Sequence, residues 1–150
     1  MDTRKNIIEY TKSQIGVKFQ HQGRLLNVAL DCAGLVVEVY KKAGLNVSDR
    51  KGYDHSPSSE QFLETIQENC VKISEDKIQI GDICIFSFGS EPQHVAIISS
   101  IDKENNIIKI THSLMSARRI VEHTLDKDWR NKLRGFYVHK ELLEQESMVK

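Results

Sequence analysis

A cysteine stands where a loop is expected to become a helix. The run DCAGLVVEVYKKAG, residues 31–44, has apolar residues at helical spacing and ends at Gly44, a residue typical of a left-handed helix cap. Asp31 is a suitable N-cap, which puts Cys32 in the first turn. The helix dipole and the unpaired N–H groups there favour a thiolate, so the sequence predicts a lowered pKa for Cys32 and a nucleophile. The alternative is a small buried core residue.

Two histidines supply the base that a cysteine nucleophile needs and a group to orient that base. Residues 94–101 and 107–112 are predicted strands joined by the turn DKENN, and a symmetric hairpin places His94 opposite residue 114, with His112 diagonally beside it. Equal parity puts both rings on one apolar face, where we expect a buried helix to dock. A one-residue slip would separate them, and aligned histidines also occur for purely structural reasons.

Zinc is the competing use of these residue types. The sequence contains no CxxC pair, no HExxH and no short Cys/His cluster, although distant ligands can still converge in a fold. It also contains no glycine-rich phosphate loop. We therefore predict neither a metal site nor a cofactor.

The composition indicates one compact domain, residues 1–150, with 39% hydrophobic content. Basic and acidic residues both number 21, which gives no electrostatic reason to expect nucleic acid or an anionic membrane as a partner. The N-terminus alternates charged and apolar residues, so no signal peptide is predicted and synthesis in the cytoplasm is expected. An odd number of cysteines, Cys32, Cys70 and Cys84, argues against a disulfide framework.

The elements that position the cysteine and histidines form an α+β pattern. A first helix is expected from Asp2 or Thr3 to Gly16, a second at residues 32–43 and a third around 58–66. Predicted strands follow at residues 71–73, 83–88, 94–101, 107–111, 119–124 and 135–138. Residues 125–133 are a predicted short helix or turn whose Trp129 packs under the last strand. Residues 140–150 are a predicted fraying tail, helical near Leu142.

The order of DCAGLVVEVYKKAG, GDICIF, HVAIISSID and IKITHS resembles the NlpC family of papain-like cysteine peptidases, many of which cleave peptide stems of the bacterial cell wall. The resemblance spans about residues 7–138. It implies a papain-like fold, with N-terminal helices and a nucleophile at a helix start packed on a mostly antiparallel sheet. It also implies a Cys-His-His triad of Cys32, His94 and His112. The flanking runs GVKFQHQGR and RIVEHTLDKDWRNKLRGFYV look closest to the phage-associated branch.

The resemblance implies a cell-wall peptidase or amidase whose partners are peptidoglycan stem peptides. The protein would act on the wall after release, or after delivery by a phage tail or secretion machine. The loop before the cysteine helix is predicted to line the substrate cleft, with Asp31, His21 and Arg24 binding the charged ends of a peptide and Phe19 beside them.

Two departures from the family pattern leave other functions open. Ala33 stands where many relatives have serine, and Phe19 where many have a tyrosine hydroxyl. A non-catalytic phage-tail assembly or wall-binding module with the same fold is one alternative. A delivered amidase or acyltransferase toxin is the other.

Overall fold

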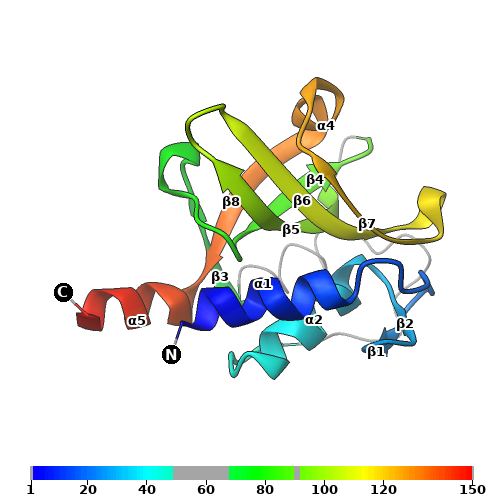
Figure 1. Ribbon diagram of the computed structural model, residues 1–150, viewed down its shortest axis with the longest axis horizontal. Coiled ribbons are helices and arrows are strands. Elements are labelled where there is room, and N and C mark those ends of the chain that lie inside the picture. The colour runs from blue at the N-terminus through cyan, green and yellow to red at the C-terminus, as the bar shows by residue number, and fades with distance from the viewer. Residues whose placement is uncertain (1, 49–67, 90–91, 150) are drawn as a thin grey trace.

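The structure, a computed structural model, describes residues 2–48, 68–89 and 92–149. Helices α1 (Thr3–Ser13), α2 (Cys32–Lys42) and α5 (Lys140–Val149) gather on one side of a curved sheet, and α4 (Lys127–Lys132) lies on its other side (Figure 1). The predicted helix around residues 58–66 lies outside the described residues. No helix in the described part of the chain is long and apolar enough to cross a membrane.

Within the described residues the sheet has six strands in the order β3-β8-β4-β5-β6-β7, and every neighbouring pair is antiparallel. Its strands are β3 (Cys70–Ile73), β4 (Ile83–Ser87), β5 (Pro92–Asp102), β6 (Ile107–Leu114), β7 (Arg119–Thr124) and β8 (Leu133–His139). A separate hairpin of β1 (Arg24–Leu25) and β2 (Ala29–Leu30) precedes α2, and the short 3₁₀ helices η1 (Glu75–Lys77) and η2 (Met115–Ala117) complete the described elements. The α+β prediction and the mostly antiparallel sheet are therefore confirmed.

The ends of the first two helices follow from local side-chain chemistry. Asp2 caps α1 by accepting from the Arg4 N–H at 3.1 Å, and Asp31 caps α2 by accepting from the Gly34 N–H at 2.7 Å. Gly16 and Gly44 both have φ of +92°, the left-handed region that glycine enters without strain. The start of α2 at Cys32, on which the nucleophile prediction depends, is therefore confirmed.

The β5–β6 hairpin has the predicted register over its outer half. Ile98 pairs with Ile110 and Ile97 with Thr111, whereas nearer the turn Ile101 pairs with Ile108. A bulge between Ile98 and Ser100 takes up the one-residue difference. His94 and His112 consequently lie on the same face, as predicted.

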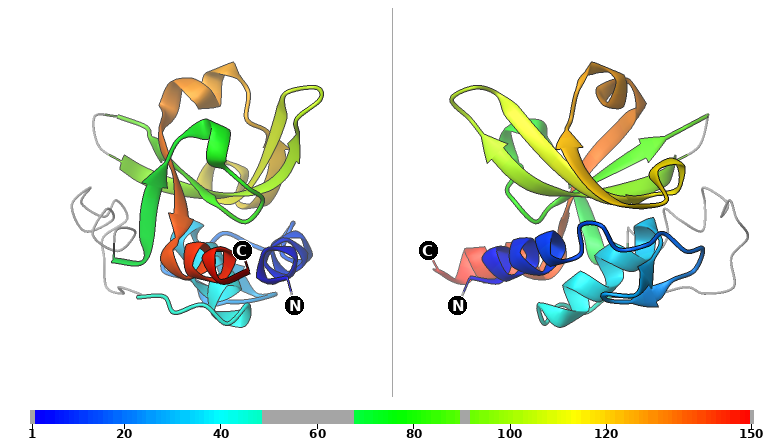
Figure 2. Two further views of the ribbon diagram at one scale, coloured as in Figure 1. Left: turned by 90° about the vertical axis from the view of Figure 1, so that its left-hand side faces the viewer. Right: turned by 45° about the vertical axis from the view of Figure 1, so that its right-hand side comes forward.

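Two apolar cores lie on opposite faces of the sheet, because side chains alternate along each strand. The first core packs α1, α2 and α5 against β4, β5 and β8, and its members include Ile7, Leu35, Val95 and Leu142. The second core contains Cys84, Phe86, Ala96 and Ile110 and is packed by Trp129 of α4. Figure 2 shows the curved sheet between these two sets of helices.

The C-terminal segment is more ordered than the predicted fraying tail. Residues 140–149 form α5, and Leu142 is buried in the first core. Glu146 also accepts from the Arg4 guanidinium at 2.6 Å, which ties α5 to α1. Arg4 in turn donates to the buried Asp82 at 2.8 Å. These contacts, which join distant parts of the chain, hold the last helix in place.

Candidate active site

The loop before α2 is held against the start of that helix by the buried Asp31 carboxylate. Besides capping the helix, Asp31 accepts from the Arg24 guanidinium at 2.8 Å and from the Gln22 N–H at 2.9 Å. Both members of the ion pair are largely buried, with side-chain exposures of 8% for Arg24 and 6% for Asp31. The position of Cys32 is thus fixed by an aspartate that acts on the helix and the loop together.

Gly34, two residues after the cysteine, allows this close approach. A Cβ built on Gly34 would lie 2.1 Å from the carbonyl oxygen of Gly23, which is far inside van der Waals contact. The carbonyl is main chain and cannot rotate away. Packing therefore requires a glycine at position 34, because only a residue without a Cβ lets the loop that contains Gly23 lie on the first turn of α2.

The electrostatic prediction for Cys32 was wrong in sign. Burial, aided by the Asp31 carboxylate, raises the pKa of the Cys32 thiol to about 12. The main-chain N–H groups of Val95 and Ala33 donate toward the sulfur and oppose the rise, but they do not outweigh desolvation. The thiol is therefore protonated at neutral pH.

His94 and His112 are joined ring to ring. His94 Nε2 lies 2.6 Å from His112 Nδ1, and both side chains are buried, with 5% and 0% exposure. Burial, together with the positive charge that a protonated His123 would carry, lowers the pKa of His94 to about 3. Burial and the neighbouring rings of His94 and His123 lower the pKa of His112 to about 2. Both rings are consequently neutral at physiological pH.

A third histidine, which the sequence analysis did not single out, extends this pair. His123 of β7 has its Nε2 2.8 Å from His112 Nε2, and its Nδ1 lies 2.9 Å from the Thr124 carbonyl oxygen. The pairing of β6 with β7 sets His123 opposite Ile110, on the same face as His112. The strand 119–124 was predicted correctly, and its register against β6 would have revealed the third ring.

Trp129 packs beside all three imidazoles, at centroid separations of 6.1 Å from His94, 4.9 Å from His112 and 5.2 Å from His123. It also meets Phe86 edge to face at 5.1 Å. The helix that docks on the histidine face is therefore α4. The sequence predicts a buried helix on this face and places Trp129 under the last strand, whereas Trp129 packs beside the histidines of β5, β6 and β7.

The cysteine helix approaches β5 from the opposite side of the sheet. Val95 and Ile97 turn toward α2 in the first core, whereas Phe86, which pairs with His94, belongs to the second. The Cys32 sulfur reaches the strand at the N–H of Val95, the residue after His94. Within residues 2–48, 68–89 and 92–149, no hydrogen bond joins the Cys32 thiol to the His94 ring.

The residues predicted to bind substrate lie on the loop before α2. Phe19 is partly buried and donates its N–H to the Arg118 carbonyl at 3.0 Å, while His21 is partly exposed. Asp31 and Arg24 neutralise one another in their ion pair, so their structural role in holding Cys32 is evident. Their contribution to substrate binding stays a prediction.

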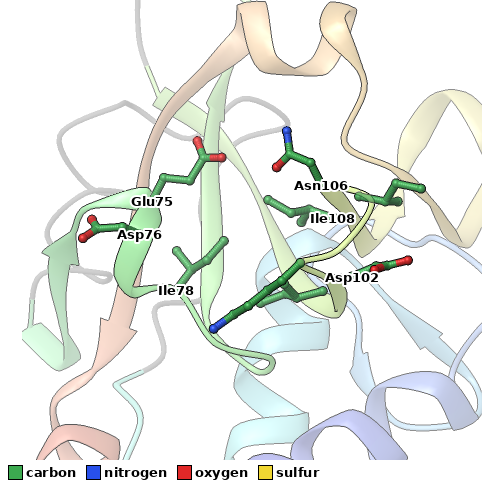
Figure 3. Close-up of a pocket in the computed structure, with 9 residues that line it drawn as sticks. Glu75, Asp76, Ile78, Asp102, Asn106 and Ile108 are labelled. Atoms are coloured by element: carbon green, nitrogen blue, oxygen red, sulfur yellow. The ribbon is translucent and has the colours of Figure 1, made fainter.

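The imidazoles are joined nitrogen to nitrogen and do not converge on one point. In the described part of the chain, no set of three His, Cys, Asp or Glu side chains is arranged to hold a metal ion. A separate pocket lies between η1 and the β5–β6 turn, lined by residues that include Glu75, Asp76, Ile78 and Asp102 (Figure 3). None of the predicted site residues lines it.

A cysteine at the start of a helix that packs on an antiparallel sheet carrying a histidine is the arrangement of papain-like proteins. The NlpC/P60 family matches residues 16–138, most of the chain, so this protein belongs to the NlpC/P60 family. The match does not distinguish the phage-associated branch from other branches. No curated protein sequence matches the chain.

Solved structures share this fold at low sequence identity. A Staphylococcus aureus subsp. aureus Mu50 protein, described as similar to a lipoprotein of the NLP/P60 family, superposes with a TM-score of 0.66 and 22% identity over 91% of this chain and 42% of its own. NlpC2 from Trichomonas vaginalis superposes with a TM-score of 0.65 and 13% sequence identity. The match covers 90% of this chain and 45% of that protein. The NlpC/p60 domain of the peptidoglycan hydrolase SagA superposes with a TM-score of 0.57 and 17% sequence identity. The match covers 90% of this chain and 97% of that domain. The chain thus spans less than half the length of the first two.

Proposed function

We propose that this protein is a cysteine peptidase or amidase that hydrolyses amide bonds in the peptide stems of bacterial cell wall. The observation that carries the proposal is the 2.6 Å hydrogen bond between His94 and His112, which orients a buried imidazole at the strand that Cys32 meets. Membership of the NlpC/P60 family and the shared fold of the peptidoglycan hydrolase SagA support the substrate class.

In the proposed mechanism, His94 Nδ1 accepts the thiol proton as the Cys32 sulfur attacks the amide carbonyl carbon. The main-chain N–H of Cys32, at the start of α2, stabilises the oxyanion of the tetrahedral intermediate. His94 then returns the proton to the leaving nitrogen, the C–N bond breaks, and a thioester remains. Water attacks the thioester, His94 takes its proton, and the S–C bond breaks as His94 passes that proton to the sulfur, which restores the thiol and the neutral imidazole.

The proposal requires the sulfur and the His94 ring to come together when substrate binds. Hydrogen bonds between catalytic groups are often long in unliganded enzymes and shorten in the substrate complex. A neutral thiol and a neutral imidazole are the protonation states from which the first step starts. The substrate lies outside the cell membrane, so the proposal includes release by lysis, or delivery by a phage tail or secretion machine.

The experiment incubates purified stem peptides with the wild type, Cys32→Ala and Cys84→Ala and follows new amino groups by mass spectrometry. Cys84 is the control, because it is another free cysteine but is fully buried in the second core, away from α2. We expect hydrolysis by the wild type and Cys84→Ala and at least about a hundredfold loss in Cys32→Ala. Equal inertness of wild type and Cys32→Ala, toward both peptides and a thiol-directed acylating probe, would contradict the proposal.

Phe19, which stands where many relatives have a tyrosine hydroxyl, favours a second candidate, a wall-binding or tail-assembly module that keeps the fold without catalysis. Such a module would bind purified peptidoglycan equally well as wild type and as Cys32→Ala, and neither would release amino groups. A delivered amidase or acyltransferase would instead form a covalent acyl adduct on Cys32 with non-wall amides. The same mass spectrometry detects that adduct.

A further inference from the structure

The row of three imidazoles ends at a group whose hydrogen-bonding role is fixed. A main-chain carbonyl oxygen can only accept, so the 2.9 Å contact between Thr124 O and His123 Nδ1 requires the proton to be on Nδ1. When the His123 ring is neutral only one of its nitrogens carries a proton, and Nε2 is then an acceptor. One carbonyl thus determines which nitrogen of the third histidine donates.

The same reasoning passes along the row. Because His123 Nε2 accepts, the hydrogen at its 2.8 Å contact belongs to His112 Nε2, and His112 Nδ1 is then an acceptor. The 2.6 Å contact between His112 Nδ1 and His94 Nε2 consequently takes its hydrogen from His94. His94 is left with a lone pair on Nδ1, the nitrogen that a general base needs.

We propose that His123 is a positioning residue that sets the tautomer of His94 through His112, so that His94 Nδ1 is held ready to accept a proton. The part of this inference that concerns catalysis rests on the proposed function, whereas the tautomer itself does not. Trp129 packs against each ring of the row, so the imidazoles cannot turn over without displacing the indole.

If the row ended at His112, no group would determine which nitrogen of His94 carries the proton. His112 alone accepts or donates at Nδ1 equally well, and either choice satisfies a partner ring. The wrong choice puts the proton on His94 Nδ1 and removes the base. The third ring and its carbonyl partner therefore decide between two arrangements that the His94–His112 pair leaves equivalent.

The test measures tautomers directly in the full chain. Long-range ¹⁵N–¹H NMR spectra of protein labelled in histidine nitrogens show which ring nitrogen carries a hydrogen, and Gln variants of each histidine assign the signals. We expect His94 to be protonated at Nε2 alone in the wild type. His123→Leu removes the acceptor for His112, and we expect both tautomers of His94 to appear.

Two further variants separate this effect from misfolding. In His123→Glu the ionised carboxylate can only accept from His112 Nε2, so we expect the single His94 tautomer to return. Arg119→Gln changes an exposed residue on the same strand and keeps all three rings, so its spectrum matches the wild type. Thermal unfolding of each variant verifies that the fold is retained.

Kinetics supply the second readout. With stem peptides as substrate, kcat falls about tenfold or more in His123→Leu while KM is retained, and His123→Glu recovers most of it. A wild type that hydrolyses nothing would count against the proposed function. The NMR spectra would still show which nitrogen of His94 carries the hydrogen, and so would still test the inference. A hydrogen on His94 Nδ1 in the wild type, or an unchanged His94 tautomer in His123→Leu, would overturn the inference.

Discussion

Cys32 shows how burial can reverse an expectation drawn from helix position. The Ala33 N–H in the first turn of α2 and the Val95 N–H of β5 donate toward the sulfur, and these alone would lower the pKa of the thiol. The side chain packs against the first core, however, and loses water there, and the Asp31 carboxylate adds a negative charge beside it. The sequence shows the helix start and the adjacent aspartate, but not how much water the fold removes.

The pH dependence of Cys32 alkylation tests this balance. Because the folded pKa is raised to about 12, we expect iodoacetamide labelling at Cys32 to rise about tenfold per pH unit from pH 7 to 9, with no plateau. Asp31→Asn keeps an N-cap oxygen but removes the charge, so labelling at pH 8 should be about threefold to tenfold faster.

Peptide mapping by mass spectrometry distinguishes Cys32 from Cys70 and Cys84, both buried. Glu38→Gln, which neutralises a carboxylate later in α2 that pairs with Lys41, is the matched control and leaves the rate at Cys32 unchanged. A plateau below pH 8 in the wild type would mean that the helix N-terminus outweighs burial.

At the scale of elements, the start of α2 depends on the loop that crosses it. Gly34→Ala would force a Cβ to within 2.1 Å of the Gly23 carbonyl, so the loop or the helix start must move. We expect a loss of about 2–3 kcal/mol in the free energy of unfolding, measured by urea denaturation, since overpacking against main chain has few ways to relax. The displaced first turn should also lower hydrolysis of stem peptides.

Gly89→Ala is the control for that variant. A Cβ at Gly89 meets no atom within 4 Å, and the residue does not have a positive φ. Its unfolding free energy should stay within about 0.5 kcal/mol of wild type. Equal stability of Gly34→Ala and wild type would mean that the loop of residues 22–24 moves away without cost.

The sequence predicted the hairpin that carries His94 and His112, because alternation along two strands and one turn determines their common face. It did not predict what covers that face. Trp129 reaches the histidines because β8 returns between β3 and β4, and nothing in the local pattern of residues 125–133 specifies that order. His123 was missed for a related reason, since its role depends on how β7 pairs with β6.

At the scale of the whole molecule, the buried histidines make stability depend on acid. His94 and His112 have folded pKa values of about 3 and about 2, below the value near 6.5 of an exposed imidazole. The unfolded chain therefore binds more protons than the folded one between these limits. Their contribution to stability is full above pH 6.5 and is lost as the pH falls toward 3.

Each such imidazole adds a slope of up to ~1.4 kcal/mol per pH unit to the free energy of unfolding. We expect urea denaturation to show this slope in the free energy of unfolding between pH 7 and 4.5. In His112→Gln about one proton fewer is taken up on unfolding, so the slope should be smaller. His112→Gln is also less stable at pH 7, because the row loses the two hydrogen bonds of the His112 ring. The prediction is therefore tested by the change of unfolding free energy with pH, and not by its value at one pH. Carboxylates titrate alike in both proteins, and Lys103→Gln, at the exposed hairpin turn, keeps the full slope. Parallel curves for wild type and His112→Gln would show that His112 is charged, or reached by water, inside the fold.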